Sequence, residues 1–169
     1  MTHLLAIAVT LAPGQTGMPD IGRLLGKPIP DFAMTSTDGG KLTKKSLFGK
    51  VYVLDFWASW CGPCKIVSGH LNDFHKSYAK KGLHIIGANM GEDPKSKNVA
   101  ALYKKEHKYA YTFTKENDKL AGKLGVVNLP TLILVDQKGT VDKIFVGWHP
   151  TEVGAKLEER IKALLNLDK

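Results

Sequence analysis

Residues 51–65 read VYVLDFWASWCGPCK. The first eight are an almost unbroken run of β-branched, aromatic and other apolar side chains, interrupted only by Asp55. A run without polar alternation is typical of a central strand that is covered on both faces. Two cysteines, Cys61 and Cys64, follow three and six residues after its end. The sequence therefore predicts a buried strand over residues 51–58 that leads into a pair of thiols.

A helix is predicted over residues 63–81, directly after this strand. Its apolar side chains recur at intervals of four, three and four residues, at Val67, Leu71, Phe74 and Tyr78. That spacing marks one face of an α-helix, and extending it backwards by three residues leads to Cys64. We therefore expect Cys64 to face the core and Cys61 to lie exposed at the helix N-terminus.

Two thiols in these positions favour thiol–disulfide exchange. The free N–H groups and the positive end of a helix dipole stabilise a thiolate, which lowers the cysteine pKa from about 8.5. Pro63 fits the first helical turn, where its missing N–H costs nothing, and Gly62 allows a partner backbone to approach. We expect Cys61 to attack a substrate disulfide and Cys64 to resolve the mixed disulfide that results.

Composition excludes several other classes. The chain has 169 residues, which fits one domain, and only two cysteines, so it is not a scaffold stapled by disulfides. A tetrahedral zinc site needs four ligands, and there is no second Cys-x-x-Cys. The net charge of +8 comes from lysines spread along the chain. We interpret it as a solvated basic surface and expect no nucleic-acid partner and no cofactor.

The remaining patterns predict an α/β domain with helices on both faces of the sheet. A hairpin is expected where residues 30–36 and 41–43 flank the turn Asp38-Gly39-Gly40. Further strands are expected at 83–90, 131–135 and 140–146, the last two as an antiparallel hairpin. Further helices are expected at 93–103, 117–124 and 151–167.

The N-terminus predicts a segment outside the domain. Residues 4–12 are a short apolar stretch with the length of a secretory signal core, although Pro13 directly after Ala12 is unfavourable for cleavage. The alternative is a loosely packed tail. Residues 13–27 are rich in Gly and Pro and are interpreted as a linker. We expect residues 1–25 to be signal segment and linker, and residues 26–169 to be the domain.

Residues 53–65 closely resemble the active-site stretch of thioredoxins. Two further features are similar to the extracytoplasmic TlpA/ResA-like branch: the entry segment GKPIPDF at residues 26–32 with its hairpin, and an insert around residues 92–117. The resemblance implies a thioredoxin fold with a mixed central sheet flanked by helices, an N-terminal β-hairpin and a central helical insert. Departures from this branch are Val67 and Gly69, where its members often carry an acid and a proline.

The resemblance implies a substrate groove beside the cysteines. Asn128-Leu129-Pro130-Thr131 is similar to the cis-proline loop of the family, in which the backbone of the residue before the proline pairs with substrate. This assigns Leu129 and Pro130 to the groove, together with Gly147 after the last strand. Trp60, Gly62 and Pro63 complete it, with Trp60 covering the active site. From the residues alone, Pro130 is simply a proline at the start of a strand.

Two carboxylates are candidates for proton transfer. Asp55 lies inside an apolar strand, where an ionised group is costly, so its pKa should be raised. The resemblance implies that Asp55 shuttles a proton for the buried cysteine, and that Glu92 is a second carboxylate near the sulfurs. The alternatives are a buried Asp held by local hydrogen bonds and an ordinary loop Glu before Pro94. Which of the two would accept the proton stays open.

The resulting hypothesis is a monomeric oxidoreductase that reduces oxidised proteins outside the cytoplasm and is recharged by a membrane-bound or soluble dithiol donor. A cytoplasmic location is the alternative to the periplasmic or other extracytoplasmic one. Two other activities remain open. One is a peroxidase-type redoxin, and the other is a copper chaperone with Cys61 and Cys64 as soft ligands and Met90 as the plausible third.

Overall fold

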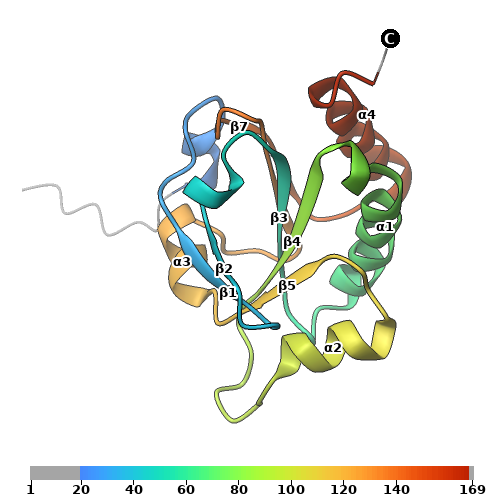
Figure 1. Ribbon diagram of the computed structural model, residues 1–169. Coiled ribbons are helices and arrows are strands. Elements are labelled where there is room, and N and C mark those ends of the chain that lie inside the picture. Colours follow the sequence, from blue (N-terminus) through green and yellow to red (C-terminus); the bar gives the residue numbers. More distant parts are fainter. Residues whose placement is uncertain (1–19, 168–169) are drawn as a thin grey trace, which may run out of the picture.

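The computed structural model describes residues 20–167, so the expected signal segment lies outside the described residues. A seven-stranded mixed sheet has the strand order β2-β1-β5-β4-β3-β6-β7 (Figure 1). The strands are β1 (Ala33–Ser36), β2 (Lys41–Thr43), β3 (Val51–Trp57), β4 (Leu83–Asn89), β5 (Thr112–Lys115), β6 (Thr131–Val135) and β7 (Val141–Val146). The helices are α1 (Gly62–Tyr78), α2 (Val99–His107), α3 (Asp118–Leu124) and α4 (Ala155–Leu164). This confirms the predicted thioredoxin fold.

Strand β3 lies inside the sheet and every one of its residues is buried. It pairs in parallel with β4 and antiparallel with β6. Because side chains alternate along a strand, Val53 and Trp57 pack in a core cluster with α1, α2 and α4. Leu54 and Phe56 pack in a second cluster with α3 and the short helix η1 (Ile21–Leu24). The prediction of a strand covered on both faces is confirmed.

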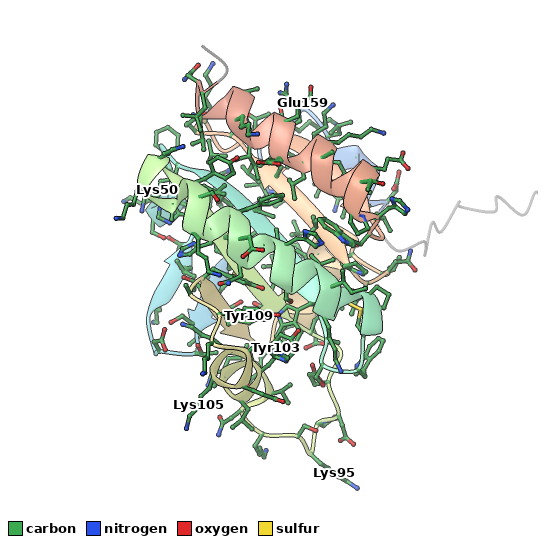
Figure 2. All side chains as sticks on the ribbon, turned by 90° about the vertical axis from the view of Figure 1, so that its right-hand side faces the viewer. Lys50, Lys95, Tyr103, Lys105, Tyr109 and Glu159 are labelled. Atoms are coloured by element: carbon green, nitrogen blue, oxygen red, sulfur yellow. A yellow bond between two sulfur atoms is a disulfide. The ribbon has the colours of Figure 1, made fainter. Side chains whose placement is uncertain are left out.

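The two clusters lie on opposite faces of the sheet. Figure 1 shows α1 and α4 on one side of it and α3 on the other. Figure 2 shows the molecule from the α1 side. Helices α1 and α4 cross in front of the sheet, and α2 lies below α1 in this view. Helix α1 begins at Gly62, one residue before the predicted start, and continues through Gly69 to Tyr78. Gly82, with φ 104°, then ends the short 3-10 turn that follows it.

The insert between β4 and β6 differs from the prediction. The helix expected at 93–103 is observed at Val99–His107, because Asp93 folds the preceding segment into a turn, accepting from the N–H groups of Lys95 and Ser96, each at 2.8 Å. Strand β5 was not predicted. It is only four residues long, but it pairs with both β4 and β1. The insert therefore contributes a strand as well as a helix, and it attaches the N-terminal hairpin to the sheet.

The packed body begins before the expected boundary at Gly26. Leu24 is buried in the second core cluster, and the Gly26 N–H donates to the carbonyl oxygen of Val141 at 2.9 Å. The end of the expected linker is therefore anchored on β7. At the other end, α4 is preceded by a π-helical turn at Pro150–Gly154 rather than forming one helix from residue 151. Among residues 20–167, no helix has the length and apolar character needed to cross a membrane.

Two glycines give a matched test of the packing between β3, β4 and β5. A Cβ at Gly87 would lie 3.1 Å from the Phe113 ring and 3.2 Å from Trp57 Nε1, whereas at Gly69 it would meet nothing within 4 Å outside its own helix. We expect Gly87→Ala to lower the free energy of unfolding by about 1–3 kcal/mol through overpacking. Gly69→Ala should raise it by about 0.5–1 kcal/mol, because alanine favours the helix. Urea denaturation measures both, and equal effects would contradict this packing.

Candidate active site

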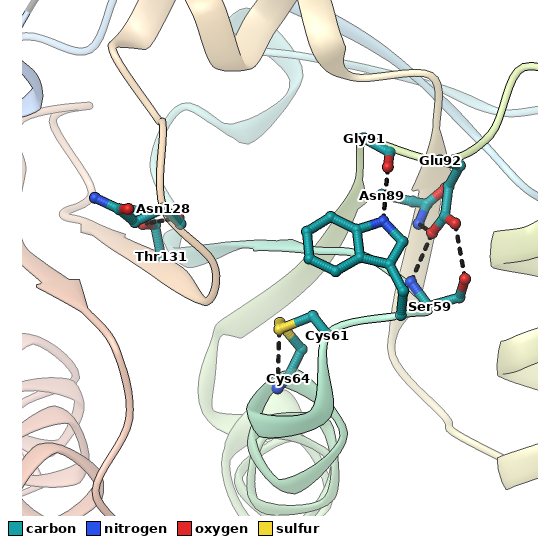
Figure 3. Close-up of a disulfide and its surroundings, with 9 residues drawn as sticks. Ser59, Cys61, Cys64, Asn89, Gly91, Glu92, Asn128 and Thr131 are labelled. Carbon is teal, nitrogen blue, oxygen red and sulfur yellow. Dashed lines mark hydrogen bonds between the residues drawn. A yellow bond between two sulfur atoms is a disulfide. The ribbon is translucent and has the colours of Figure 1, made fainter.

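The two cysteines form a disulfide at the start of α1, with a Cα–Cα distance of 5.3 Å (Figure 3). Cys61 is the N-cap residue, and its Sγ accepts a hydrogen bond from the Cys64 N–H at 3.3 Å. Pro63 lies in the first turn, as expected, and both Gly62 and Pro63 are exposed. One sulfur therefore caps the positive N-terminal end of a 17-residue helix.

The expectation that Cys61 is exposed is wrong for this oxidised form. Its relative exposure is 5%, against 0% for Cys64, and both belong to the core cluster on the α1 side. In this form Cys61 is bonded to the fully buried Cys64. The predicted order still holds, since Cys61 is the more exposed of the two cysteines.

The segment before Cys61 is held by the loop that follows β4. The Glu92 carboxylate accepts from the Ser59 N–H at 2.6 Å, from the Ser59 hydroxyl at 2.7 Å and from the Asn89 side-chain amide at 2.7 Å (Figure 3). Next to it, the Trp60 indole N–H donates to the Gly91 carbonyl oxygen at 2.7 Å. Both carboxylate oxygens of Glu92 thus accept hydrogen bonds. Through them, Glu92 attaches the segment before Cys61 to the loop after β4.

Trp60 is 65% exposed at the mouth of the site, where it presents an apolar surface to solvent. Trp57 is fully buried and packs against Tyr103 at 4.4 Å and Phe113 at 5.4 Å between ring centroids. Trp57 therefore belongs to the core beneath the start of α1. This leaves Trp60 as an exposed flank of the disulfide.

The proline loop lies at the same end of the sheet, because Thr131 pairs with Phe56 near the end of β3. The Leu129–Pro130 peptide bond is cis, as the resemblance implied. Thr131 Oγ1 donates to the Asn128 carbonyl oxygen at 2.7 Å (Figure 3). The Gly147 N–H donates to the Pro130 carbonyl oxygen at 2.8 Å, and Gly147 has φ 82°, which favours glycine.

Asp55 faces the α1 side of the sheet, since it alternates in phase with Val53 and Trp57. It is fully buried, and neither carboxylate oxygen has a hydrogen-bond partner within residues 20–167. Burial raises the pKa of Asp55 from 3.8 to about 8. The local hydrogen bonds that would hold a purely structural aspartate are therefore not found in this part of the chain.

Sequence reasoning missed three hydroxyl groups on the same side of the sheet: Ser68 of α1, Tyr103 of α2 and Tyr111 before β5. The signal available for Ser68 was its position four residues after Cys64, on the same helix face. Tyr103 and Tyr111 carried no such signal, because α2 was misplaced and β5 was not predicted. Ser59 and Asn89, the partners of Glu92, were missed for the similar reason that a loop determines their contacts.

A metal centre finds no support in the described residues. Residues 20–167 contain no group of three or more His, Cys, Asp and Glu side chains placed to hold an ion. Met90, the soft ligand considered with the cysteines, packs against the core cluster on the α3 side of the sheet. The cysteines belong to the cluster on the other side.

Comparisons with known proteins agree with this geometry. Residues 24–163 match the Redoxin family. A thiol-disulfide oxidoreductase ResA from Bacillus thuringiensis is 34% identical over 129 residues, 76% of this chain and 73% of the relative. A solved Chlorobium tepidum structure assigned as a thiol:disulfide interchange protein DsbE is 30% identical, with a TM-score of 0.74, over 83% of this chain and 97% of that one. A second thiol:disulfide interchange protein from this organism, 25% identical, has a TM-score of 0.70 over 82% and 95% of the two chains.

The buried Asp55 should make folding stability depend on pH. Its pKa is about 8 in the folded protein, against 3.8 for an aspartate side chain in water, so between these values the folded state holds a proton that the unfolded state releases. Stability from this group is therefore full below pH 3.8 and is lost as pH rises towards 8. Replacing Asp55 by Asn should raise the free energy of unfolding at pH 7 by on the order of 4 kcal/mol and flatten this slope.

Urea denaturation of the oxidised protein between about pH 4 and pH 8 measures this dependence. The control is Asp73→Asn, since Asp73 lies on the exposed side of α1 with 72% of its side chain accessible. An Asp55→Asn curve parallel to that of the wild type would show that Asp55 is ionised in the folded protein.

Proposed function

The chain belongs to the Redoxin family and is a thiol–disulfide oxidoreductase of the ResA and DsbE type, and on that premise we propose that it reduces disulfides of other proteins outside the cytoplasm. The observation that carries the proposal is the unequal placement of two adjacent sulfurs. Cys61 caps the N-terminus of α1, and Cys64 is wholly buried one turn further on.

The reaction begins with both cysteines reduced. The Cys61 thiolate attacks one sulfur of the substrate disulfide, so that a Cys61–substrate bond forms and the first substrate thiolate leaves and takes up a proton. Cys64 then loses its proton and attacks the Cys61 sulfur, which releases the second substrate thiolate. The substrate disulfide is reduced to two thiols and the protein dithiol is oxidised to the Cys61–Cys64 disulfide.

Cys61 is the first nucleophile in this scheme for an electrostatic reason. Cys61 is the N-cap residue of α1, and the Cys64 N–H donates to its Sγ at 3.3 Å. Such donors favour a thiolate over a thiol. Cys64 has no access to solvent, which suits a thiol that meets only the mixed disulfide.

Asp55 accepts the Cys64 proton in this mechanism. It lies on the same side of the sheet as Cys64, its oxygens have no competing donor within residues 20–167, and burial raises its pKa to about 8. A base with a pKa near the working pH transfers protons efficiently. Glu92, whose two oxygens already accept three hydrogen bonds, acts as a positioning residue for the segment that carries Trp60 and Cys61.

The substrate lies across Trp60, Gly62 and Pro63 on one side and the proline loop on the other. Leu129 supports this, because its N–H and carbonyl make no backbone hydrogen bond within the described residues. They can pair with an extended substrate strand. The buried Pro130 lies beneath them, and Gly147 holds the Pro130 carbonyl.

Trapping of the intermediate tests the order of attack. We expect Cys61→Ser to abolish insulin reduction, because the first nucleophile is lost. Cys64→Ser should accumulate a mixed disulfide through Cys61, seen as a heavier band on a non-reducing gel that dithiothreitol removes. The double variant is the control and should trap nothing. Full insulin reduction by Cys61→Ser would contradict the mechanism.

The direction of electron flow is proposed as reduction of the substrate, with a membrane-bound or soluble dithiol restoring the protein. The support is the Gly62-Pro63 spacer, which resembles that of reducing thioredoxins. We expect the Cys61–Cys64 couple to have a potential near that of thioredoxin, about −270 mV, measured by equilibration with glutathione or dithiothreitol. A potential near about −120 mV would identify an oxidant instead.

The extracytoplasmic location is supported by the apolar stretch at residues 4–12 and by the similarity to the TlpA/ResA-like branch. Cell fractionation decides between this and a cytoplasmic protein. Recovery of the full-length protein with cytoplasmic markers would contradict the proposed location and leave the chemistry of the cysteines unaffected.

A further inference from the structure

Three buried hydroxyl groups share the α1 side of the sheet with Asp55. Ser68 and Tyr111 have no exposed surface and Tyr103 is 7% exposed. None of the three hydroxyls has a hydrogen-bond partner within residues 20–167, and the same is true of both Asp55 oxygens. Leaving a buried polar group unpaired costs about 1–3 kcal/mol, so a cluster of such groups requires a physical reason.

The four groups come from four different segments of the chain and lie on the same side of the sheet. Ser68 follows Cys64 by one helical turn on the buried face of α1. Tyr103 comes from α2, and Tyr111 immediately precedes β5. The Tyr111 and Tyr103 rings both pack on Phe113, with centroid distances of 4.5 and 6.0 Å.

The pKa values of the two tyrosines depend on the neighbouring Asp55 and Ser68 side chains. Burial is the main cause that raises the pKa of Tyr103 to about 12 and that of Tyr111 well above 10, and the negative charge of Asp55 raises both further. The neighbouring Ser68 hydroxyl lowers both, although no hydrogen bond of good geometry joins these hydroxyls within residues 20–167. For Asp55 itself, burial is the sole cause of its shift.

The cluster reaches the surface through Tyr103. Its ring centroid is 5.8 Å from that of Tyr109, which is half-buried, and Figure 2 shows the two together beside α2. Tyr109 in turn has its pKa raised by burial, lowered by Tyr103 and raised by Asp73. His107 packs on the rings of Tyr103 and Tyr109, with centroid distances of 4.4 and 5.3 Å. The ring of His75 faces Tyr111 at 6.5 Å. Tyr103, Tyr109 and His107 are therefore titratable groups on the outer side of the cluster, with Asp73 beyond them.

We propose that Ser68, Tyr103 and Tyr111, bridged by internal water, solvate the Asp55 carboxylate and pass its proton to the surface at Tyr109. The inference rests on the proposed role of Asp55 as acceptor of the Cys64 proton. In each turnover, Asp55 takes one proton when the Cys64–Cys61 bond forms, and Cys64 takes up one proton when the disulfide is reduced again. The relay exchanges this proton with the surface between the two steps. A neutral hydroxyl passes a proton by accepting it on oxygen and donating its own, so no tyrosinate forms.

The relay explains the positions of all three hydroxyls. Bulk water does not reach Asp55, which has no exposed surface. A buried hydroxyl cluster of this kind holds ordered water where each molecule can find two or more polar partners. The high pKa values of the tyrosines suit this role, because they keep both hydroxyls protonated and able to donate.

Tyr111→Phe tests the inference directly, since it removes one oxygen and leaves the ring. We expect the Asp55 pKa of the reduced protein, followed by the carboxyl carbon signal in NMR, to rise by about one unit, because the relay loses a hydroxyl that donates to the carboxylate through water. At pH 7 the ionised fraction of Asp55 then falls about tenfold, and single-turnover release of substrate by Cys64 should slow by about the same factor. Ser68→Ala and Tyr103→Phe should act in the same direction.

Tyr52→Phe is the matched control. The Tyr52 hydroxyl is equally buried and without a partner in the described residues, and Tyr52 lies on the same strand as Asp55 but faces the α3 side. It should leave both the Asp55 pKa and the release rate unchanged. An equal response to Tyr52→Phe, or an unchanged Asp55 pKa and release rate in all three other variants, would overturn the proposal.

Asp55→Asn separates this inference from the proposed function. If Asp55→Asn slows release while the three hydroxyl variants leave it unchanged, the relay is wrong and the role of Asp55 stands. If Asp55→Asn releases substrate at the wild-type rate, Asp55 is not the proton acceptor and the relay falls with it. The NMR titration reports on the hydroxyls in either case, because it does not depend on turnover.

Discussion

Burial of β3 on both faces is the constraint from which the site follows. The strand is paired on both edges and covered by a core cluster on each face, so its position in the molecule is fixed. Its end therefore delivers Cys61 to the start of α1 at a defined place. The same burial leaves the one charged residue of the strand, Asp55, without solvent. Sulfur placement and proton chemistry are two consequences of one packed strand.

Loops that meet at this end of the sheet hold the segments around the disulfide in place. Hydrogen bonds to Glu92 attach the segment before Cys61 to the end of β4. A hydrogen bond from Gly147 attaches the proline loop to the end of β7. These contacts join segments that are far apart in the chain, since Ser59 and Glu92 are separated by 33 positions. Hydrogen bonds that involve backbone groups thus hold the segments on both sides of the disulfide in place.

The sequence predicted whatever depends on long apolar patterns or on local motifs. Strand β3, helix α1, the burial of Cys64 and the raised pKa of Asp55 all follow from residues 51–78. The insert was misread, because β5 has only four residues and gains its order from pairing with β1 and β4. The exposure of Cys61 was overestimated, since a motif does not reveal its oxidation state. Tyr103 and Tyr111 could not be found at all, because only the fold brings them beside Asp55.

The free-energy cost of burying the Asp55 carboxyl argues that this residue is functional rather than structural. An unpaired carboxyl in the core weakens folding over the pH range where it would be ionised in solution, and an apolar side chain at this position would remove that cost. Three further hydroxyls without partners in the described residues lie on the same side of the sheet. A purely structural core gains nothing from such a set, since each unpaired group is destabilising. Proton transfer to and from a buried thiol, in contrast, requires a base that is shielded from solvent and groups that connect it to the surface.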